Sequence, residues 1–231
     1  SSAAPPAVTV TVEPLAKGVY YVKGGGHYSV AIDQRDHIVV VEAPLNEARS
    51  LAVIAKVKAT IPDKPIRYLI NTHHHFDHSG GLRTYVDEGA TIVTYQANKS
   101  YFQKVLSQPH TLIPDRQSEA KKKISIETVG DKKVMTDGNH VIELHRMAGS
   151  NHNEGLMVAY LPKEKILVEA DGFNPPAQAN APVVMPVNPN TINLAENLAR
   201  LKLDVETIIP VHYPADGRKV TMAELNRALG K

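Results

Sequence analysis

The sequence predicts an α/β protein in which two β-sheets pack face to face and helices cover their outer sides. Three observations predict this fold. The 231 residues suit one large domain with a substantial core. Segments with the apolar pattern of β-strands form two groups, at residues 8–95 and 124–211, and segments with helical spacing accompany both groups. Because each sheet must bury an apolar face, two strand groups in one domain are expected to pack on each other.

The first group opens with four predicted strands, a β-meander that can bury one face. These strands span residues 8–12, 18–22, 28–32 and 37–41. Glycines 24–26 and polar residues 33–36 mark two of the turns. A helix is predicted over residues 46–61, because Asn46 is a favourable N-cap and Pro62 cannot continue the helix. The rest of the group alternates between a strand at 66–71, a helix from 82, a strand at 91–95 and a helix at 96–108.

The second group follows a polar, irregular segment at residues 109–120. Its five predicted strands span residues 124–126, 132–135, 141–145, 156–160 and 166–170. Asp137-Gly138-Asn139 marks a hairpin between the second and the third of these strands. The proline-rich residues 173–189 predict an extended loop. The chain is then predicted to close with a helix at 190–203, a strand at 205–211 and a helix at 221–229.

Residues 8–231 are therefore expected to form a single domain, with residues 1–7 as a flexible leader. Cleavage of an export signal could leave such a leader, which favours a periplasmic or secreted location, and a shortened recombinant chain explains it equally well. No apolar stretch approaches the roughly 20 residues needed to span a bilayer. The net charge of +2 is too small to indicate nucleic-acid binding. We expect a small-molecule substrate and no nucleic-acid or membrane partner, and the sequence leaves the oligomeric state open.

A dense cluster of metal-binding side chains follows the predicted strand at 66–71. Four of the eleven histidines and one carboxylate lie within residues 73–78. The cluster ends in two glycines and a predicted helix, so it occupies a loop at the carboxyl end of a strand, where α/β folds place their ligands. His73 and His75 are spaced to bind one metal, and Asp77 and His78 to bind a second. His74 is expected to point away from them. The alternative is a chance histidine tract that chelates metal weakly.

Three later residues are further candidate ligands. His152 lies in a loop between two predicted strands, and Asp171 and His212 each follow an apolar strand. The chain contains no cysteine, so any metal must be held by nitrogen and oxygen. That donor set suits zinc, iron, manganese or nickel.

The His-x-His-x-Asp-His motif and the positions of the later ligands resemble those of the metallo-β-lactamase-fold superfamily. The resemblance covers almost all of the chain after the leader, including Val41-Glu42-Ala43-Pro44. It implies a four-layer αββα sandwich with a dinuclear site in a groove between the edges of the sheets. It also implies two ligand sets, with His73, His75 and His152 on the first metal, Asp77, His78 and His212 on the second, and Asp171 as a carboxylate bridge. Because zinc β-lactamases usually carry cysteine or serine at the position of Asp171, the chain resembles instead the thioesterase (glyoxalase II), lactonase, phosphodiesterase and sulfatase branches.

The function that this resemblance implies is that of a dinuclear zinc hydrolase, although iron or manganese suit the same ligands. Two divalent ions would share a water and lower its pKa, so that a bridging hydroxide attacks a small ester, thioester, lactone or amide. Weak β-lactamase activity is compatible with the scaffold. Asp77 would be the catalytic residue, because it would orient the nucleophile and accept its proton as well as bind the second metal.

Several alternatives remain open at this point. The leading one is an iron-dependent oxidoreductase similar to persulfide dioxygenases. A nuclease is disfavoured by the mild charge, and a metal-binding protein without catalysis is disfavoured by the complete ligand sets. Tyr213, His27 and Phe173 are candidate substrate contacts, although packing or a surface position explains each of them as well.

Overall fold

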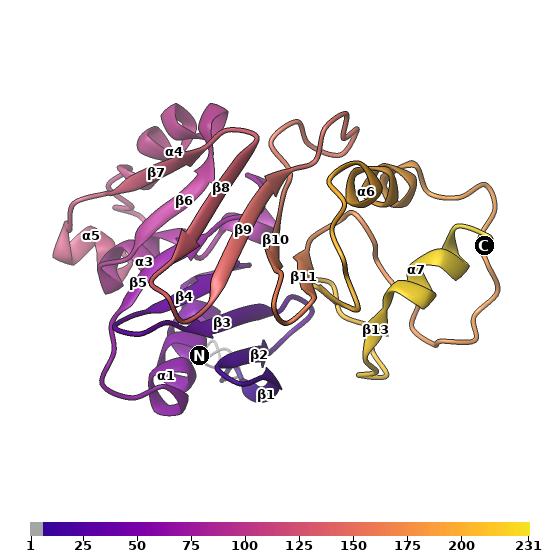
Figure 1. Ribbon diagram of the computed structural model, residues 1–231. Coiled ribbons are helices and arrows are strands. Elements are labelled where there is room, and N and C mark those ends of the chain that lie inside the picture. The colour runs from indigo at the N-terminus through magenta and orange to yellow at the C-terminus, as the bar shows by residue number, and fades with distance from the viewer. Residues whose placement is uncertain (1–6) are drawn as a thin grey trace, which may run out of the picture.

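The computed structural model describes residues 7–231, in which two β-sheets lie face to face with helices on their outer sides (Figure 1). The predicted α/β sandwich is therefore confirmed. The proposed leader falls almost entirely on residues 1–6, which lie outside the described residues.

The first sheet has seven strands in the order β1-β2-β3-β4-β5-β6-β7. They are β1 (Thr11–Ala16), β2 (Val19–Lys23), β3 (Ser29–Asp33), β4 (Ile38–Val41), β5 (Ile66–Ile70), β6 (Thr91–Tyr95) and β7 (Ile126–Val129). Neighbouring strands are antiparallel from β1 to β4 and parallel from β4 to β7. The carboxyl ends of β4, β5 and β6 therefore meet at one edge of the sheet.

The second sheet has six strands in the order β13-β12-β11-β10-β9-β8. They are β8 (Lys132–Thr136), β9 (Val141–Arg146), β10 (Met157–Leu161), β11 (Ile166–Glu169), β12 (Thr207–Pro210) and β13 (Val220–Thr221). The pair β11–β12 is parallel and the other pairs are antiparallel. The residues that follow β11 and β12 consequently emerge side by side.

The helices lie on the outer sides of the two sheets (Figure 1). They are α1 (Glu47–Thr60), α2 (Phe76–Ser79), α3 (Leu82–Glu88), the 3-10 turn η1 (Gln96–Asn98), α4 (Lys99–Leu106), α5 (Arg116–Ala120), α6 (Pro189–Arg200) and α7 (Met222–Ala228). The side chain of Asn46 accepts a hydrogen bond from the backbone N–H of Arg49, which confirms the predicted N-cap of α1.

Three apolar clusters fill the spaces between the four layers: one lies between the two sheets, and the other two lie between each sheet and its helices. On β4, Val39 and Val41 face the second sheet, whereas Ile38 and Val40 face α1, α3 and α4. On the second sheet, alternate strand residues such as Val158 pack against α6 and α7. This period of two is what a strand buried on both faces requires.

The structure differs from the sequence prediction at four elements. The strand predicted at residues 124–126 as the first of the second group is instead β7 (Ile126–Val129), which pairs with β6 in the first sheet. Strand β1 begins at Thr11 rather than at residue 8, because its pairing with β2 runs from Thr11 opposite Lys23. The histidine loop includes one helical turn, α2. The segment expected to be irregular, residues 109–120, ends in α5, which a capping box between Asp115 and Ser118 stabilises.

Backbone hydrogen bonds join the two sheets beside the histidine loop. The N–H of Met157 donates to the carbonyl of Thr72 at 2.9 Å, and the N–H of Tyr28 donates to the carbonyl of Val211 at 3.0 Å. The first bond connects the histidine loop to β10, and the second connects the β2–β3 turn to the end of β12. These bonds hold the ends of the two sheets in register where the candidate ligands emerge.

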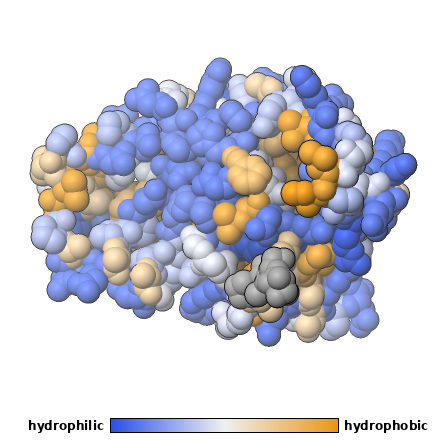
Figure 2. Space-filling view, turned by 180° about the vertical axis from the view of Figure 1, so that it is seen from behind, coloured by the Kyte–Doolittle hydropathy of each residue, from blue (hydrophilic) through white to orange (hydrophobic). Residues whose placement is uncertain are grey.

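The surface of the molecule is largely hydrophilic, with a few separate apolar patches (Figure 2). The large apolar side chains with the highest exposure are Phe76, Leu112, Ile113, Val184 and Met185. None of the helices within residues 7–231 has the length and apolar character needed to cross a bilayer.

Candidate metal centre

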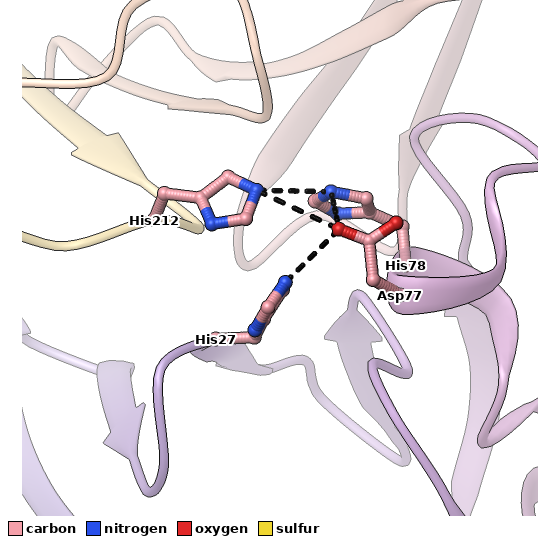
Figure 3. Close-up of side chains that lie close together, drawn as sticks. All are labelled: His27, Asp77, His78 and His212. Atoms are coloured by element: carbon pink, nitrogen blue, oxygen red, sulfur yellow. Dashed lines mark hydrogen bonds and ion pairs between the residues drawn. The ribbon is translucent and has the colours of Figure 1, made fainter.

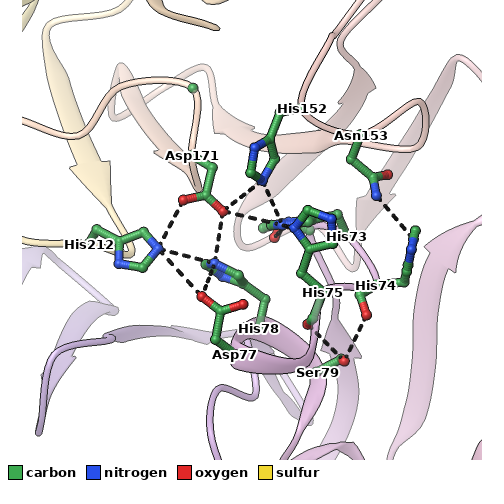
Figure 4. A network of polar contacts seen from close by, with 12 residues as sticks. His73, His74, His75, Asp77, His78, Ser79, His152, Asn153, Asp171 and His212 are labelled. Atoms are coloured by element: carbon green, nitrogen blue, oxygen red, sulfur yellow. Dashed lines mark hydrogen bonds and ion pairs between the residues drawn. The ribbon is translucent and has the colours of Figure 1, made fainter.

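The predicted ligands come from four loops that the two sheets bring to one edge (Figure 4). The histidine loop follows β5, the loop with His152 joins β9 to β10, Asp171 follows β11, and His212 follows β12. Their side chains point toward one another although they span 140 positions of the sequence. The structure thus brings together all seven residues that were predicted as ligands, and their role as metal ligands stays a prediction.

The first group of donors is His73, His75, His152 and Asp171, whose ligand atoms all lie within 4.8 Å of one another. Nε2 of His73 lies 3.1 Å from Nδ1 of His75 and 3.3 Å from Nε2 of His152. The side chain of His73 is completely buried, and that of His152 is one quarter exposed. The group therefore opens to solvent on the side of His75 and His152.

The second group is His27, Asp77, His78 and His212, which satisfy the same 4.8 Å limit (Figure 3). Oδ2 of Asp77 lies 3.2 Å from Nε2 of His78 and 3.1 Å from Nε2 of His27. Nε2 of His212 lies 3.2 Å from Nε2 of His78. His27, which the sequence indicates only as a possible substrate contact, is thus part of a donor group.

Asp171 lies between the two groups and contacts both. Its Oδ2 atom is 3.2 Å from His73, 3.1 Å from His152 and 2.9 Å from His78, each measured to Nε2. Its Oδ1 atom is 2.9 Å from Nε2 of His212. This is the placement that a carboxylate bridge between two cations requires.

The turn that carries Asp171 is held by a second carboxylate, Glu169. Oε2 of Glu169, a completely buried side chain, accepts hydrogen bonds from the backbone N–H groups of Gly172 and Phe173. Asp171 adopts a φ of 61°, which is uncommon for a residue other than glycine. The bonds to Glu169 stabilise this turn and with it the direction of the Asp171 side chain.

Glu42, the residue that follows β4, contacts His78 of the second group. Both its side chain and that of His78 are completely buried, and Oε2 of Glu42 lies 3.0 Å from Nδ1 of His78. Oε2 also accepts a hydrogen bond from the Thr72 hydroxyl, and Oε1 accepts one from the Thr72 N–H. Glu42 therefore orients His78 and the start of the histidine loop together.

The two glycines after the motif permit a close approach of backbones. A Cβ atom on Gly80 would lie 2.0 Å from the carbonyl oxygen of Leu45, and one on Gly81 would lie 2.1 Å from Oγ of Ser50. Only glycine leaves room for the helical turn α2 to rest on the segment between β4 and α1. That contact fixes the position of α2, so that His78 lies against the side chain of Glu42.

The donor groups fit divalent transition metals. A tetrahedral ion with bonds of about 2.0–2.1 Å to nitrogen keeps its ligand atoms roughly 3.3–3.4 Å apart. The nitrogens of His73, His75 and His152 show separations of 3.1 and 3.3 Å. One N–H on Nε2 of His73 cannot satisfy both neighbouring nitrogens and Asp171 as well, whereas a cation among them would satisfy all three.

Comparison with known proteins shows the family of the chain. Residues 22–212 match the family model described as the metallo-beta-lactamase superfamily, which is most of the chain and includes every predicted ligand. The chain belongs to the metallo-beta-lactamase superfamily. The resemblance inferred from the motif is thereby confirmed.

Solved structures of the superfamily share this fold. A metallo-beta-lactamase from Pontibacter korlensis is 15% identical, with a TM-score of 0.68 and coverage of 96% of this chain and 98% of that chain. The DIM-1 metallo-beta-lactamase is 15% identical, with a TM-score of 0.69 and coverage of 96% and 97%. A metallo-beta-lactamase from Hirschia baltica is 20% identical, with a TM-score of 0.66 and coverage of 96% of both chains. At these identities the likeness shows the fold alone.

A curated protein of Nocardioides sp. (strain JS1661), the 2,4-dinitroanisole O-demethylase subunit alpha, is 24% identical over 209 residues. The alignment covers 89% of this chain and 58% of that protein, so the chain spans little more than half the length of the curated relative it matches.

Burial and neighbouring charges shift several pKa values in the two donor groups of this superfamily member. Burial lowers the pKa values of His73, His75 and His27, so these imidazoles are neutral and have lone pairs to offer. Burial also acts to lower the pKa of His78, but contacts with the carboxylates of Asp171 and Glu42 outweigh it and raise that pKa to about 10. His78 carries the positive charge among these carboxylates that a metal would otherwise supply.

Two candidate ligands, Asp171 and Asp77, are held in their charged form. Burial acts to raise the pKa of Asp171, but hydrogen bonds from His212, His73 and His78 hold it far below its usual range. Burial also acts to raise the pKa of Asp77, but the hydrogen bond from His27 and the charge of His78 outweigh it and lower that pKa. Both groups can therefore bind a cation without first losing a proton.

The other sequence candidates lie around this metallo-beta-lactamase-type centre in different ways. His74 is turned away from both donor groups, as expected, and its Nδ1 lies 3.1 Å from the amide nitrogen of Asn153 (Figure 4). Tyr213 packs edge-on against Tyr21, and its hydroxyl donates to the carbonyl of Arg218. Phe173 is 3% exposed and packs with residues of α6, but it also lines a cavity beside the proline-rich loop, so its role as a substrate contact stays a prediction.

Sequence reasoning missed Glu42 and Glu169 as supports of the ligands. The signal was present, because each is a carboxylate at the end of a wholly apolar strand. The same signal identifies Asp171 as a candidate.

Proposed function

We propose that the chain is a dinuclear metal-dependent hydrolase, with zinc as the native metal. The observation that carries this proposal is the position of Asp171, whose two oxygens reach both donor groups at 2.9–3.2 Å. Two ions that share one carboxylate are held close together, which is the arrangement of two-metal hydrolytic sites. His73, His75 and His152 hold the first ion, and Asp77, His78 and His212 hold the second.

Two divalent ions held by these residues would supply hydroxide at neutral pH and would polarise the bond that is attacked. The chain's own contribution to proton transfer is Asp77. Within residues 7–231, the side-chain hydrogen bonds and ion pairs of this carboxylate all use Oδ2. Oδ1 is thus free to orient the nucleophilic water and to accept its proton, and the side chain, which is 46% exposed, has access to it.

The substrate that we propose is a small ester, thioester, lactone or amide with an apolar acyl or aryl part. Phe76 lies between His75 and Asp77 in the sequence and is 77% exposed. We infer from this position in the sequence that the exposed ring offers substrate a flat apolar surface near the donor groups. The net charge of +2 gives no indication of a polyanionic substrate.

The curated relative is named as an O-demethylase of 2,4-dinitroanisole. An aryl methyl ether therefore belongs among the compounds to be tested, because cleavage of an activated ether by water needs the same nucleophile as ester hydrolysis. A hydrolytic reaction would release methanol without consuming oxygen.

The test is a hydrolase panel on protein loaded with zinc and, separately, with iron or manganese. The panel contains a cephalosporin, an acyl-homoserine lactone, a glutathione thioester, an aryl phosphodiester, an aryl sulfate and 2,4-dinitroanisole. We expect turnover of an acyl substrate in the zinc form, at least a hundredfold loss in Asp77→Asn, and no change in His110→Ala, whose exposed histidine lies outside both donor groups. Substrate-dependent oxygen uptake by an iron form, with no hydrolysis by the zinc form, would support the oxidoreductase alternative.

A further inference from the structure

We propose that His27 is a ligand of the second metal, beyond the seven ligands that the motif implies. The proposal rests on the dinuclear site described above and adds one residue to it. His27 comes from the β2–β3 turn, a part of the first sheet that contributes no other donor to either group.

The geometry of the second group includes His27 on equal terms with the other three side chains. Nε2 of His27 lies 3.1 Å from Oδ2 of Asp77, a distance as short as the 3.2 Å between Asp77 and His78. The longest distance from Oδ2 of Asp77 to a nitrogen of the group is 3.9 Å, to His212. Two donors on one ion with bonds of about 2.0–2.2 Å can be no more than about 4.4 Å apart, so these separations allow a common ion.

The four side chains also point at a common centre (Figure 3). The rings of His27 and His212 lie with their centroids 4.4 Å apart at an angle of 63°, and those of His27 and His78 lie 5.4 Å apart at 66°. Edge-on rings whose nitrogens converge are what imidazoles around one cation present. Edge-on rings are also common in ordinary aromatic packing, so it is the convergence of the ring nitrogens near Asp77 that indicates a common ion.

The turn that carries His27 is held in place by hydrogen bonds from a buried arginine, Arg49, to residues along the turn. Arg49, 2% exposed, donates from Nε to the carbonyl of Gly24 at 3.1 Å and from a guanidinium nitrogen to the carbonyl of His27. Its other guanidinium nitrogen donates to the hydroxyl of Ser29 at 3.2 Å. Burying a charged arginine is costly unless its donors are satisfied, and here they are satisfied by the turn.

The turn is also tied to the loop of a known candidate ligand. The N–H of Tyr28 donates to the carbonyl of Val211, so the residue after His27 is bonded to the residue before His212. This bond fixes the two histidines side by side on the open side of the second group. Neither the hydrogen bonds from Arg49 nor this bond uses the imidazole ring, so substitution of His27 leaves the support of the turn in place.

A fifth protein donor, after Asp77, His78, His212 and the bridge Asp171, changes the character of the second site. With His27, each donor group contains three imidazoles. The second group also contains the carboxylate of Asp77, in addition to the proposed bridge Asp171. Nitrogen-rich sites favour zinc, iron and cobalt over magnesium and calcium. We therefore expect the second site to hold its metal more tightly and to discriminate more strongly against hard cations than a site formed by Asp77, His78 and His212 with the bridge alone.

The decisive experiment uses the absence of cysteine from the chain. In His27→Cys loaded with cobalt(II), a thiolate bound to the metal gives a near-ultraviolet sulfur-to-cobalt charge-transfer band, and no other residue can produce it. We expect the band in His27→Cys and not in His110→Cys, the matched control at an exposed histidine outside both groups. Because a cysteine side chain is shorter than a histidine side chain, the absence of the band overturns the proposal when the second metal also binds with unchanged affinity in His27→Phe.

A second variant tests the same point without introducing a new donor. His27→Phe keeps a ring of similar size, and we expect the second metal to bind at least about tenfold more weakly while the first is unaffected. Equal affinity of both sites in wild type and His27→Phe, at unchanged Tm, would contradict the role of His27. If the wild type itself binds two metals and hydrolyses a substrate in that case, the proposed function stands and only the inference on His27 fails.

Discussion

Glu42 and His78 form a completely buried pair in which Oε2 of the carboxylate lies 3.0 Å from Nδ1 of the imidazole. The pair fixes which ring nitrogen faces the donor groups. Because Nδ1 is bonded to Glu42, Nε2 points to Asp77 and Asp171. The orientation of a candidate metal ligand is thus set by a residue 36 positions earlier in the sequence.

Glu42→Gln should weaken binding of the second metal about 10- to 100-fold. An amide has only one oxygen, so either the Thr72 N–H or the His78 N–H loses its acceptor. Isothermal titration with zinc measures the effect. Glu143→Gln is the matched control, since Glu143 pairs with His145 at 2.8 Å outside both donor groups. Equal affinities in the two variants would refute the supporting role of Glu42.

Removal of metal should destabilise the protein markedly. Each ion present at a hundred times its dissociation constant adds about 2.7 kcal/mol to the free energy of unfolding. For a chain of this size each ion then corresponds to roughly 5–10 °C in Tm, so removal of both ions by chelation should lower Tm by roughly 10–20 °C. Differential scanning fluorimetry with and without EDTA measures the shift, and Asp171→Ala should show a much smaller one. A Tm that is the same with zinc and with EDTA contradicts a structural role for bound metal.

The ion pair between Arg83 and Asp115 should make stability depend on pH in acid. Arg83 donates hydrogen bonds to both carboxylate oxygens of Asp115. These bonds lower the pKa of Asp115 from 3.8 to about 2, although burial acts to raise it. The folded state therefore favours the charged form, so this contribution is complete above about pH 4 and is lost as the pH falls toward 2.

Asp115→Asn keeps a good N-cap for α5 but removes the charge. Urea unfolding of the metal-free proteins should show a deficit of about 2 kcal/mol near pH 6 that shrinks between pH 4 and pH 2. A deficit that does not change with pH would show that the carboxylate charge is not responsible.

Phe76→Ala should raise KM for an aryl or long-chain acyl substrate by roughly tenfold and leave the metal content unchanged. Loss of an apolar contact worth about 1.4 kcal/mol accounts for a factor of ten. The variant should fold normally because the ring is 77% exposed. Leu112→Ala, at a side chain that is 96% exposed on another loop, is the control. An unchanged KM in Phe76→Ala would remove this ring from the substrate site.

The sequence predicts the sheets and the ligand loops well because both depend on local patterns. Strand β6 is predicted with its observed bounds, Thr91–Tyr95, and α1 is predicted with its N-cap. His73, His75, Asp77 and His78 stand out because one short loop contains them, and Asp171 stands out because it ends an apolar strand.

The parts that the sequence does not predict depend on contacts between distant segments. His27 joins a donor group only because Arg49 and Val211 hold its turn in place. The proline-rich loop is similarly tied down by Arg218 and Arg227, which donate to its carbonyls from more than 40 residues away. Phe173 is buried because the turn at Asp171 directs it toward α6, which no alternation in the sequence indicates.

The number of metal ions bound per chain tests the central claim most directly. Protein purified without added zinc, then saturated and desalted, is analysed by inductively coupled plasma mass spectrometry beside Asp171→Ala. If the two donor groups share Asp171 as a bridge, the wild type holds two ions per chain and the variant holds at most one. A wild type that never exceeds one ion, or an Asp171→Ala protein that retains two, would contradict a dinuclear centre bridged by this residue.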